Sequence, residues 1–260
     1  MVSFRRKGIF KVADIWFASK REKVSEQNCD FAFYHNSQLS LNEIPYGAIV
    51  KPYKTLVTSL IPSPNDIFSN FKSKVKNEIR RAIKDGVIVK MYTSEMLVKD
   101  SSIISEFDDQ HTLLFRAKGL HTNKKRKMLM AYARIGVLYI SVSYYEKIPI
   151  SFHVYISTGK IVRLLHSVSP FRNLNNHIGA SQIGRANRFQ HFFDMKYFRS
   201  LGCETYDWGG YSDSSHLQSV ARFKAGFNGE VSPISSCIIA CNFYSRMVIF
   251  ALKKLRITLL

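Results

Sequence analysis

The sequence lacks several features that would fix its structural class at once. It has no run of about 18 apolar residues, the length that a membrane-spanning helix needs, no internal repeat, and no Gly/Ser- or Pro-rich linker. Four cysteines in 260 residues are too few for a disulfide scaffold, and Cys237 and Cys241 have no second pair at zinc-site spacing. These absences predict a globular protein without spanning helices or a metal site, in a reduced, cytoplasmic setting.

Acidic residues are also scarce. Lys and Arg number 38 against 19 Asp and Glu, which gives a formal net charge of +19. Such a surface attracts polyanions, namely nucleic acid, anionic lipid headgroups or phosphorylated ligands, but the charge alone does not choose among them. No apolar stretch of signal-peptide length follows the basic residues near Met1, so no secretory signal is expected.

The first part of the chain predicts strands and then a helix. Residues 48–61 have strand-like apolar runs, interrupted at Pro52. Ser63, Pro64 and Asp66 indicate a helix start, apolar residues recur at helical spacing after them, and Gly86 ends the pattern. A short strand over 87–92 and a helix over 101–119 follow.

The second part begins with a change of apolar period to two. Residues 137–145, 150–156 and 161–168 predict three strands with short connections, which form an antiparallel meander. A polar loop over 169–177 leads into a long helix, which ends at Leu201 because Gly202 follows it. A strand over 203–208 then leads into two glycines, and a helix over 214–225, a closing strand from Val231 and a basic C-terminal helix complete the order.

Two local motifs carry a resemblance to a known family. The segments 206–210 (Tyr-Asp-Trp-Gly-Gly) and 223–229 (Phe-Lys-Ala-Gly-Phe-Asn-Gly) resemble the paired signatures of FemAB-type acyl- and aminoacyl-transferases. The resemblance covers roughly residues 55–233. It implies a GNAT-like α/β fold, with a mixed central sheet flanked by helices. We expect residues 1–100 to form a partial GNAT-like lobe and residues 101–260 the transferase domain, the two packed as one unit.

The resemblance also implies an activity. Family members transfer an acyl or aminoacyl group to an amine, often on a cell-envelope precursor. The implied co-substrate is acyl-CoA or aminoacyl-tRNA, with no permanently bound cofactor, and the implied acceptor is an amino sugar or a lipid-linked precursor. The chain has no counterpart of the helical-hairpin arm of the longer peptidoglycan enzymes. Of the two donors, this compact chain favours the thioester, acyl-CoA.

Three residues are candidates for catalysis. By resemblance, Lys224 faces a substrate phosphate and the reacting carbonyl, where a cation stabilises developing negative charge; the alternative is a surface lysine. Asp207 either accepts the amine proton or only caps backbone donors beside its glycines. His166 either acts as a base near neutral pH or is an ordinary half-buried strand histidine.

Further residues are candidates for binding. Tyr211 and Arg222 adjoin the two motifs and are expected to contact the acceptor, and Gly209 and Gly210 are expected to allow a tight turn and close approach of backbone to substrate. The expected cofactor contacts lie on the long helix, whose N-terminus would face a pyrophosphate: Gly179, Gly184, Arg185 and Arg188.

Two other interpretations use the positive charge. The first is a non-catalytic tRNA-binding protein on the same fold, although no RNA-binding motif is present. The second concerns the run over 243–257, which mixes apolar and basic residues at helical spacing. That run either lies on an anionic membrane surface, which would suit a peripheral protein with a lipid-linked acceptor, or packs as an ordinary terminal helix.

Overall fold

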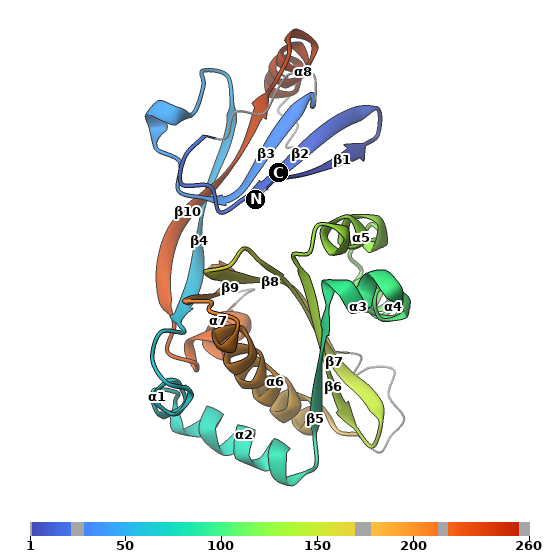
Figure 1. The fold of residues 1–260 in the computed structure, drawn as a ribbon, viewed down its shortest axis with the longest axis vertical. Coiled ribbons are helices and arrows are strands. Elements are labelled where there is room, and N and C mark those ends of the chain that lie inside the picture. Colours follow the sequence, from blue (N-terminus) through green and yellow to red (C-terminus); the bar gives the residue numbers. More distant parts are fainter. Residues whose placement is uncertain (1, 22–28, 170–177, 213–217, 255–260) are drawn as a thin grey trace. The chain divides into compact units, whose positions relative to one another are not determined.

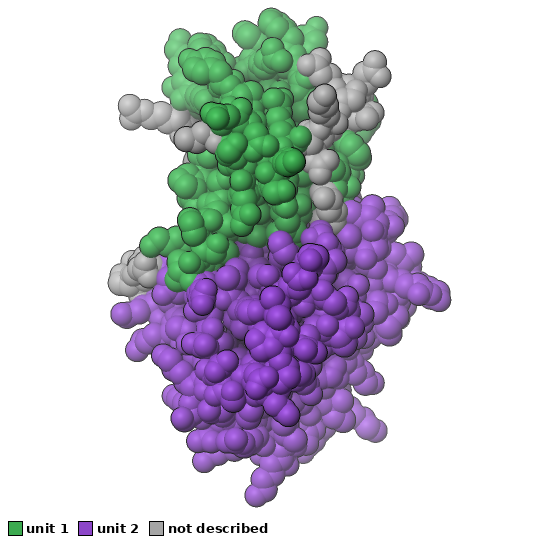
Figure 2. All heavy atoms as spheres, turned by 60° about the vertical axis from the view of Figure 1, so that its left-hand side comes forward, with its two compact units in different colours: residues 1–55, 231–260 green, residues 56–230 purple. Residues whose placement is uncertain are grey.

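The computed structural model describes residues 2–21, 29–169, 178–212 and 218–254 (Figure 1). The chain forms two compact units, residues 1–55 with 231–260 and residues 56–230, which Figure 2 colours separately. The boundary predicted near residue 100 therefore falls inside the second unit. A partial GNAT-like lobe at the N-terminus stays a prediction.

The first unit is built from both ends of the chain. Its strands lie in the order β1-β2-β3-β10-β4, where β4 contributes its first part; β2 and β3 are parallel, and β1–β2 and β3–β10 are antiparallel. The bounds are β1 Val2–Lys7, β2 Phe10–Trp16, β3 Phe31–Ser37, η1 Leu41–Glu43, β4 Ile49–Ser59, β10 Glu230–Ala240 and α8 Phe243–Lys254.

The second unit contains the predicted meander. Its strands lie in the order β4-β9-β8-β7-β6-β5, with β5 to β8 antiparallel and β8 parallel to β9. The bounds are α1 Pro64–Ser69, α2 Ser73–Lys84, β5 Ile88–Thr93, α3 Ser94–Lys99, α4 Ser102–Ala117, α5 Arg126–Arg134, β6 Leu138–Tyr145, β7 Ile148–Ser157, β8 Ile161–Val168, α6 Ala180–Ser200, β9 Thr205–Tyr211 and α7 Gln218–Ala225.

The helix predicted from Ser63 to Gly86 is two helices, α1 and α2. The predicted cap is confirmed, because Ser63 Oγ accepts a hydrogen bond from the backbone N–H of Asp66 (3.2 Å). The chain leaves the helical path near Asn70 so that Phe71 can be buried, with its ring edge-on to Phe227 at 5.0 Å. Burial of this aromatic ring competes successfully with continuation of the helix.

Three other local predictions are corrected. Strand β4 continues through Pro52, whose fixed φ suits an extended backbone. Helix α3 was not predicted, since Ser94–Lys99 is too short to show a helical period. Strand β9 includes Gly209 and Gly210, so these glycines lie in a strand and not in a tight turn.

The core of the second unit lies between the sheet and α1, α2 and α6. Its buried aromatic members are Phe71, Tyr155, Phe198, Tyr206, Trp208 and Phe227. Among the residues that the structure describes, no helix is both long and apolar enough to cross a bilayer.

Candidate functional site

The parallel ladder between strands β8 and β9 ends partway along the two strands. Their pairing ends at Arg163 opposite Asp207, although β8 continues to Val168 and β9 to Tyr211. Just beyond this point the register of β8 against β7 also shifts. The carboxyl ends of neighbouring parallel strands form the edge of a sheet where ligand sites occur.

A cavity of about 370 Å³ lies beside the carboxyl ends of β8 and β9. Strands β8 and β9 and helices α6 and α7 each contribute residues to its wall. Its wall contains both polar and apolar side chains, namely Leu164, Ser167, Asn187, His191, Trp208, Ser219, Val220, Phe223 and Lys224. Of the predicted catalytic residues, Lys224 lines this cavity.

Lys224 is buried, with 9% of its surface exposed. Its ammonium donates hydrogen bonds to the carbonyl oxygens of Gly210 (2.8 Å) and Gly209 (3.5 Å). Burial, and next the positive charge of Arg163, lower the pKa of Lys224 to about 8, while Asp207 acts in the opposite direction. The surface-lysine alternative is therefore wrong, and a desolvated cation is available at the cavity.

Asp207 is 1% exposed and has partners on both carboxylate oxygens. Oδ2 accepts a hydrogen bond from Arg163 Nη1 (2.7 Å), and Oδ1 accepts one from the backbone N–H of Gly209 (2.8 Å). This arrangement is the capping alternative that the sequence left open, extended by an ion pair. A role as proton acceptor for the substrate amine stays a prediction.

Gly209 permits a close approach between the two parallel strands. Its φ is +78°, in the left-handed region that favours glycine, and a Cβ there would lie 3.1 Å from the carbonyl oxygen of Leu164. Gly210 has open space around its Cβ position, and its carbonyl oxygen instead holds Lys224. The glycine pair thus lets β9 come close to β8 and present carbonyl oxygens to the lysine.

His166 lies with α4 and not with the cavity residues. Its ring is 5.8 Å from that of Phe107 and 5.1 Å from that of His111, measured between centroids. Burial, with the charges of His111 and Lys125, lowers its pKa to about 3. A histidine with this pKa is neutral throughout the physiological range, and the structure does not bring it together with Lys224.

The predicted acceptor contacts lie at the edge of the site. Tyr211 ends β9 and packs, partly buried, against the core. Arg222 is exposed on α7, two residues before Lys224. Neither residue lines the 370 Å³ cavity, so their contact with a substrate stays a prediction.

Both arginines predicted for cofactor binding are ion-paired. Arg185 Nη2 lies 2.9 Å from Asp85 Oδ2, and Arg188 Nε lies 2.6 Å from Glu78 Oε2. Arg188 also lies over the ring of Phe223, at 4.8 Å from its centroid. These contacts hold α6 against α2 and α7, so both arginines stabilise the packing of these helices.

The two glycines predicted for cofactor binding mark the start of α6. Gly179 is the N-cap residue of that helix and has no side chain to cap it. Gly184 lies within the helix, and its carbonyl oxygen accepts a hydrogen bond from Arg188 Nη1 (2.8 Å). The polar loop predicted before the helix falls largely on residues 170–177, outside the described part of the chain.

Asn187 and His191, two of the polar residues of the cavity wall, were not among the residues predicted from the sequence. Both lie on α6 and are followed by Asp194, at the spacing i, i+4, i+7 that places side chains on one helix face. This face is turned toward the sheet, and His191 and Asp194 are buried. The sequence signal that could have identified them is this polar stripe on α6, a helix that also carries an apolar stripe.

Three buried side chains of the described region have the spacing of metal ligands, His153, His191 and Asp194, whose candidate ligand atoms lie within 4.8 Å of one another. However, His153 Nδ1 is already 2.8 Å from Asp194 Oδ2, and His191 Nδ1 is 2.7 Å from the hydroxyl oxygen of Tyr206. The two imidazole rings also stack, at 4.1 Å between centroids. Hydrogen bonds thus account for these side chains without a metal ion.

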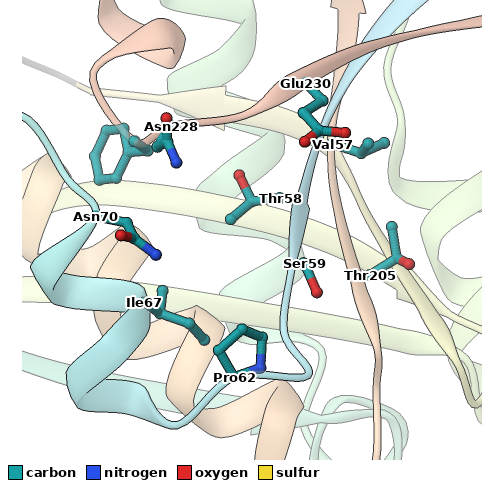
Figure 3. A pocket seen from close by; sticks show the side chains of 10 residues that line it. Val57, Thr58, Ser59, Pro62, Ile67, Asn70, Thr205, Asn228 and Glu230 are labelled. Atoms are coloured by element: carbon teal, nitrogen blue, oxygen red, sulfur yellow. The ribbon is translucent and has the colours of Figure 1, made fainter.

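A second cavity of about 230 Å³ lies at the opposite end of β9, beside Thr205 (Figure 3). Figure 3 shows its polar side chains, among them Thr58, Asn70 and Asn228, and a single carboxylate, Glu230. None of the residues predicted for catalysis or binding lines it. The cavity that contains Lys224 is therefore the candidate site.

Comparison with known proteins gives a likeness of fold. No protein-family model and no curated protein sequence matches the chain. A solved structure of FemX matches 96% of this chain and 85% of its own length, with a TM-score of 0.64 and 12% identity. The structure of L-PGS from Bacillus licheniformis matches 98% of this chain and 85% of its own, with a TM-score of 0.51 and 9% identity.

A third solved structure is the C-terminal domain of a protein assigned as a lysylphosphatidylglycerol synthetase from Agrobacterium fabrum. It matches 98% of this chain and 84% of its own length, with a TM-score of 0.55 and 10% identity. At these identities the likeness concerns the fold. The fold predicted from the sequence, a mixed sheet flanked by helices of the FemAB-like and GNAT-like type, is confirmed.

Proposed function

We propose that this protein is an N-acyltransferase, which moves an acyl or aminoacyl group from a thioester or ester donor to an amine. The observation that carries the proposal is Lys224, a buried cation in the wall of a cavity at the carboxyl ends of two parallel strands. The names of the neighbours, FemX and a lysylphosphatidylglycerol synthetase, support aminoacyl transfer to a cell-envelope precursor.

The cavity offers what acyl transfer requires without a covalent intermediate. Binding donor and acceptor side by side supplies much of the rate, because the reacting atoms are held in place. As the amine attacks the carbonyl carbon, negative charge develops on the carbonyl oxygen, and the Lys224 ammonium stabilises it in a site with little water. The apolar wall, Leu164, Trp208 and Phe223, helps to exclude that water.

Two observations favour an aminoacyl ester over acyl-CoA as the donor of the transferred group. Recognition of CoA was expected to use Arg185 and Arg188, but both guanidinium groups are ion-paired with carboxylates. Aminoacyl-tRNA suits the net charge of +19, because its phosphates are attracted over the whole surface. The acceptor we propose is an amine on an amino sugar or on a lipid-linked precursor.

Thermal stabilisation by ligands tests the proposal. Acetyl-CoA, uncharged tRNA and a pool of aminoacyl-tRNAs are compared, and a ligand at a hundred times its Kd adds roughly 2.7 kcal/mol. Stabilisation by aminoacyl-tRNA, followed by transfer of the labelled aminoacyl group to an amine and loss of that transfer in Lys224→Ala, is the expected result. Binding of charged and uncharged tRNA alike, with a steep salt dependence and no transfer, would instead establish the nucleic-acid-binding alternative.

The first unit carries a feature that suits a lipid-linked acceptor. On α8, Phe243, Met247 and Phe250 form one exposed apolar stripe, with 69%, 55% and 66% of their surfaces exposed. A cavity of about 940 Å³ runs beside this helix, and its wall includes four cations, Arg21, Arg246, Lys253 and Lys254. Exposed aromatic and apolar residues next to cations are typical of helices that lie on anionic membranes.

We therefore propose peripheral contact of α8 with an anionic membrane surface. Sedimentation with vesicles of phosphatidylglycerol and of phosphatidylcholine tests it. We expect binding to the first, reduced by Met247→Ser with Phe250→Ser but not by Ile61→Ser, an exposed apolar residue of the second unit. Equal binding to both vesicle types, or no effect of the α8 changes, would refute the proposal.

A further inference from the structure

Five titratable side chains form a connected cluster behind the cavity. Helix α6 provides His191 and Asp194, strand β7 provides His153 and Tyr155, and strand β9 provides Tyr206. Each is at most 2% exposed. Residues two apart on a strand, or three apart on a helix, share a face, so the spacing of these residues directs all five toward one point between the sheet and α6.

The hydrogen bonds of this cluster have one direction. The hydroxyl of Tyr155 donates to Asp194 Oδ2 at 2.6 Å. A hydroxyl carries one proton, so the 2.7 Å bond between the hydroxyls of Tyr155 and Tyr206 must be donated by Tyr206. The proton of Tyr206 is then used, and its oxygen must accept from His191 Nδ1 at 2.7 Å. His191 therefore has its proton on Nδ1 and a free electron pair on Nε2.

The second histidine fits the same scheme. Its Nδ1 lies 2.8 Å from Asp194 Oδ2, which only accepts, so His153 donates there. Its Nε2 lies 3.3 Å from Asn187 Nδ2, an amide nitrogen that only donates. His153 thus donates from Nδ1 and accepts at Nε2, and Asp194 is the common acceptor of the cluster.

The surroundings of His191 keep its imidazole neutral. Burial, followed by the electrostatic effects of the nearby His153, Lys224 and Arg188, lowers its pKa well below the usual value. Its ring packs among aromatic rings of β9 and α7, with centroids 4.5 Å from Trp208 and 5.6 Å from Phe223. The ring also lines the cavity that contains Lys224.

One oxygen of the cluster is left without a partner. Asp194 Oδ1 is buried and accepts no hydrogen bond from the described residues. Leaving a buried carboxylate oxygen unsatisfied costs free energy, and such a group in a folded protein calls for a reason. The hydrogen bonds run from His191 through the two tyrosines to Asp194. The negative charge of Asp194 would therefore stabilise a positive charge that forms on the His191 imidazole.

We propose that His191 is a catalytic residue, the group that accepts a proton from the acceptor amine, and that Tyr206, Tyr155 and Asp194 are positioning residues that hold its tautomer. This inference rests on the proposed function and deepens it. It also fills a gap in the site, because the carboxylate of Asp207 is already bound to Arg163 and to the backbone of Gly209.

The step balances without another reactant. The amine nitrogen attacks the carbonyl carbon, and a C–N bond forms as the carbonyl π electrons move to oxygen, beside the Lys224 ammonium. The nitrogen, now positively charged, loses a proton to His191 Nε2. When the tetrahedral intermediate collapses, the bond from carbon to the donor oxygen or sulfur breaks, and the imidazolium returns the proton to that leaving group.

The first test does not depend on activity. Long-range ¹H–¹⁵N NMR of histidine-labelled protein reads the tautomer of each imidazole, and comparison with His191→Gln assigns the signals. We expect His191 with its proton on Nδ1 from pH 6 to pH 8, and a shift toward the Nε2 proton in Tyr206→Phe. A proton on Nε2 in the wild-type protein, or no change in Tyr206→Phe, overturns the inference.

The second test measures single-turnover transfer with the donor, aminoacyl-tRNA or acetyl-CoA, that the wild-type protein uses. We expect His191→Gln to lower the rate by roughly 10²–10⁴-fold, and Tyr206→Phe to lower kcat about tenfold with KM unchanged. Tyr197→Phe, a half-buried tyrosine on α6 outside the cluster, is the matched control. Near-UV circular dichroism confirms that each variant folds.

The outcomes separate the two proposals. Wild-type turnover that His191→Gln leaves unchanged overturns the role of His191 and keeps the transferase. No turnover with either donor overturns the transferase and with it the catalytic role, while the NMR result still decides whether the tautomer was derived correctly.

Discussion

Replacing Lys224 by methionine should stabilise the protein at neutral pH while removing its activity. The side chain is buried, and its pKa is lowered from 10.5 to about 8. A pKa difference of this size means that folding disfavours the charged form of the lysine by about 3 kcal/mol. Methionine removes that cost but also removes the hydrogen bonds to Gly209 and Gly210, each about 1 kcal/mol. The expected net gain at pH 7 is roughly 1–3 kcal/mol.

The pH dependence identifies the cause. Between pH 8 and pH 10.5 the unfolded chain binds more protons at this lysine than the folded chain, so the stability of the wild-type protein rises with pH through this residue. The advantage of Lys224→Met should therefore be complete below pH 8 and shrink by up to about 3 kcal/mol by pH 10.5. Other titrating groups are common to both proteins and cancel in the difference.

Urea denaturation at pH 7, 9 and 10.5 measures this difference. Lys74→Met, an exposed lysine of α2, controls for the loss of one positive charge from a protein of net charge +19. A stability difference that stays constant over this pH range, or a Lys224→Met variant that is less stable at every pH, would refute this reasoning. Either result would show that burial of the Lys224 ammonium does not destabilise the folded protein.

Other substitutions test the remaining parts of the site. Asp207→Asn breaks its buried ion pair with Arg163 and should cost roughly 3–5 kcal/mol in urea denaturation. Glu204→Gln breaks an exposed pair and should cost less than about 1 kcal/mol, and equal costs would contradict this. Gly209→Ala should cost about 1–2 kcal/mol for its positive φ alone, more than Gly210→Ala, and the reverse order would refute the close approach of β8 and β9. Because the pKa of His166 is lowered to about 3, the wild-type protein should lose up to roughly 1.4 kcal/mol per pH unit below pH 6.5 through this residue; His166→Asn should lose less Tm between pH 7 and pH 4, and equal acid sensitivity would disprove the shift.

The sequence predicted what depends on local period and capping. The meander, the long helix α6 and the end of that helix at Gly202 follow from alternation, helical spacing and a glycine with positive φ. The break between α1 and α2 did not, because burial of Phe71 against Phe227 depends on a contact across about 150 residues. A local pattern contains no information about such a partner.

The same limit applies to the site. Lys224 was found by resemblance, and its burial agrees with the expectation of a desolvated cation. His191 was missed, since its chemistry depends on Tyr206, 15 residues away, and through it on Tyr155 and Asp194. A histidine on an otherwise ordinary helix shows its tautomer only when the direction of every hydrogen bond around it is known.

The construction of the first unit from both chain ends has a consequence for synthesis on the ribosome. Ser37 of β3 pairs with Ser235 of β10, 198 residues later. At roughly 5–20 residues per second, that edge of β3 waits about 10–40 s for its partner, while residues 56–230 have already emerged and can fold. A newly made chain thus exposes one edge of an apolar strand, which includes Phe31 and Phe33, until β10 emerges. Such an edge is a template for wrong pairing, so the yield of folded protein should depend on how fast the segment between β3 and β10 is translated.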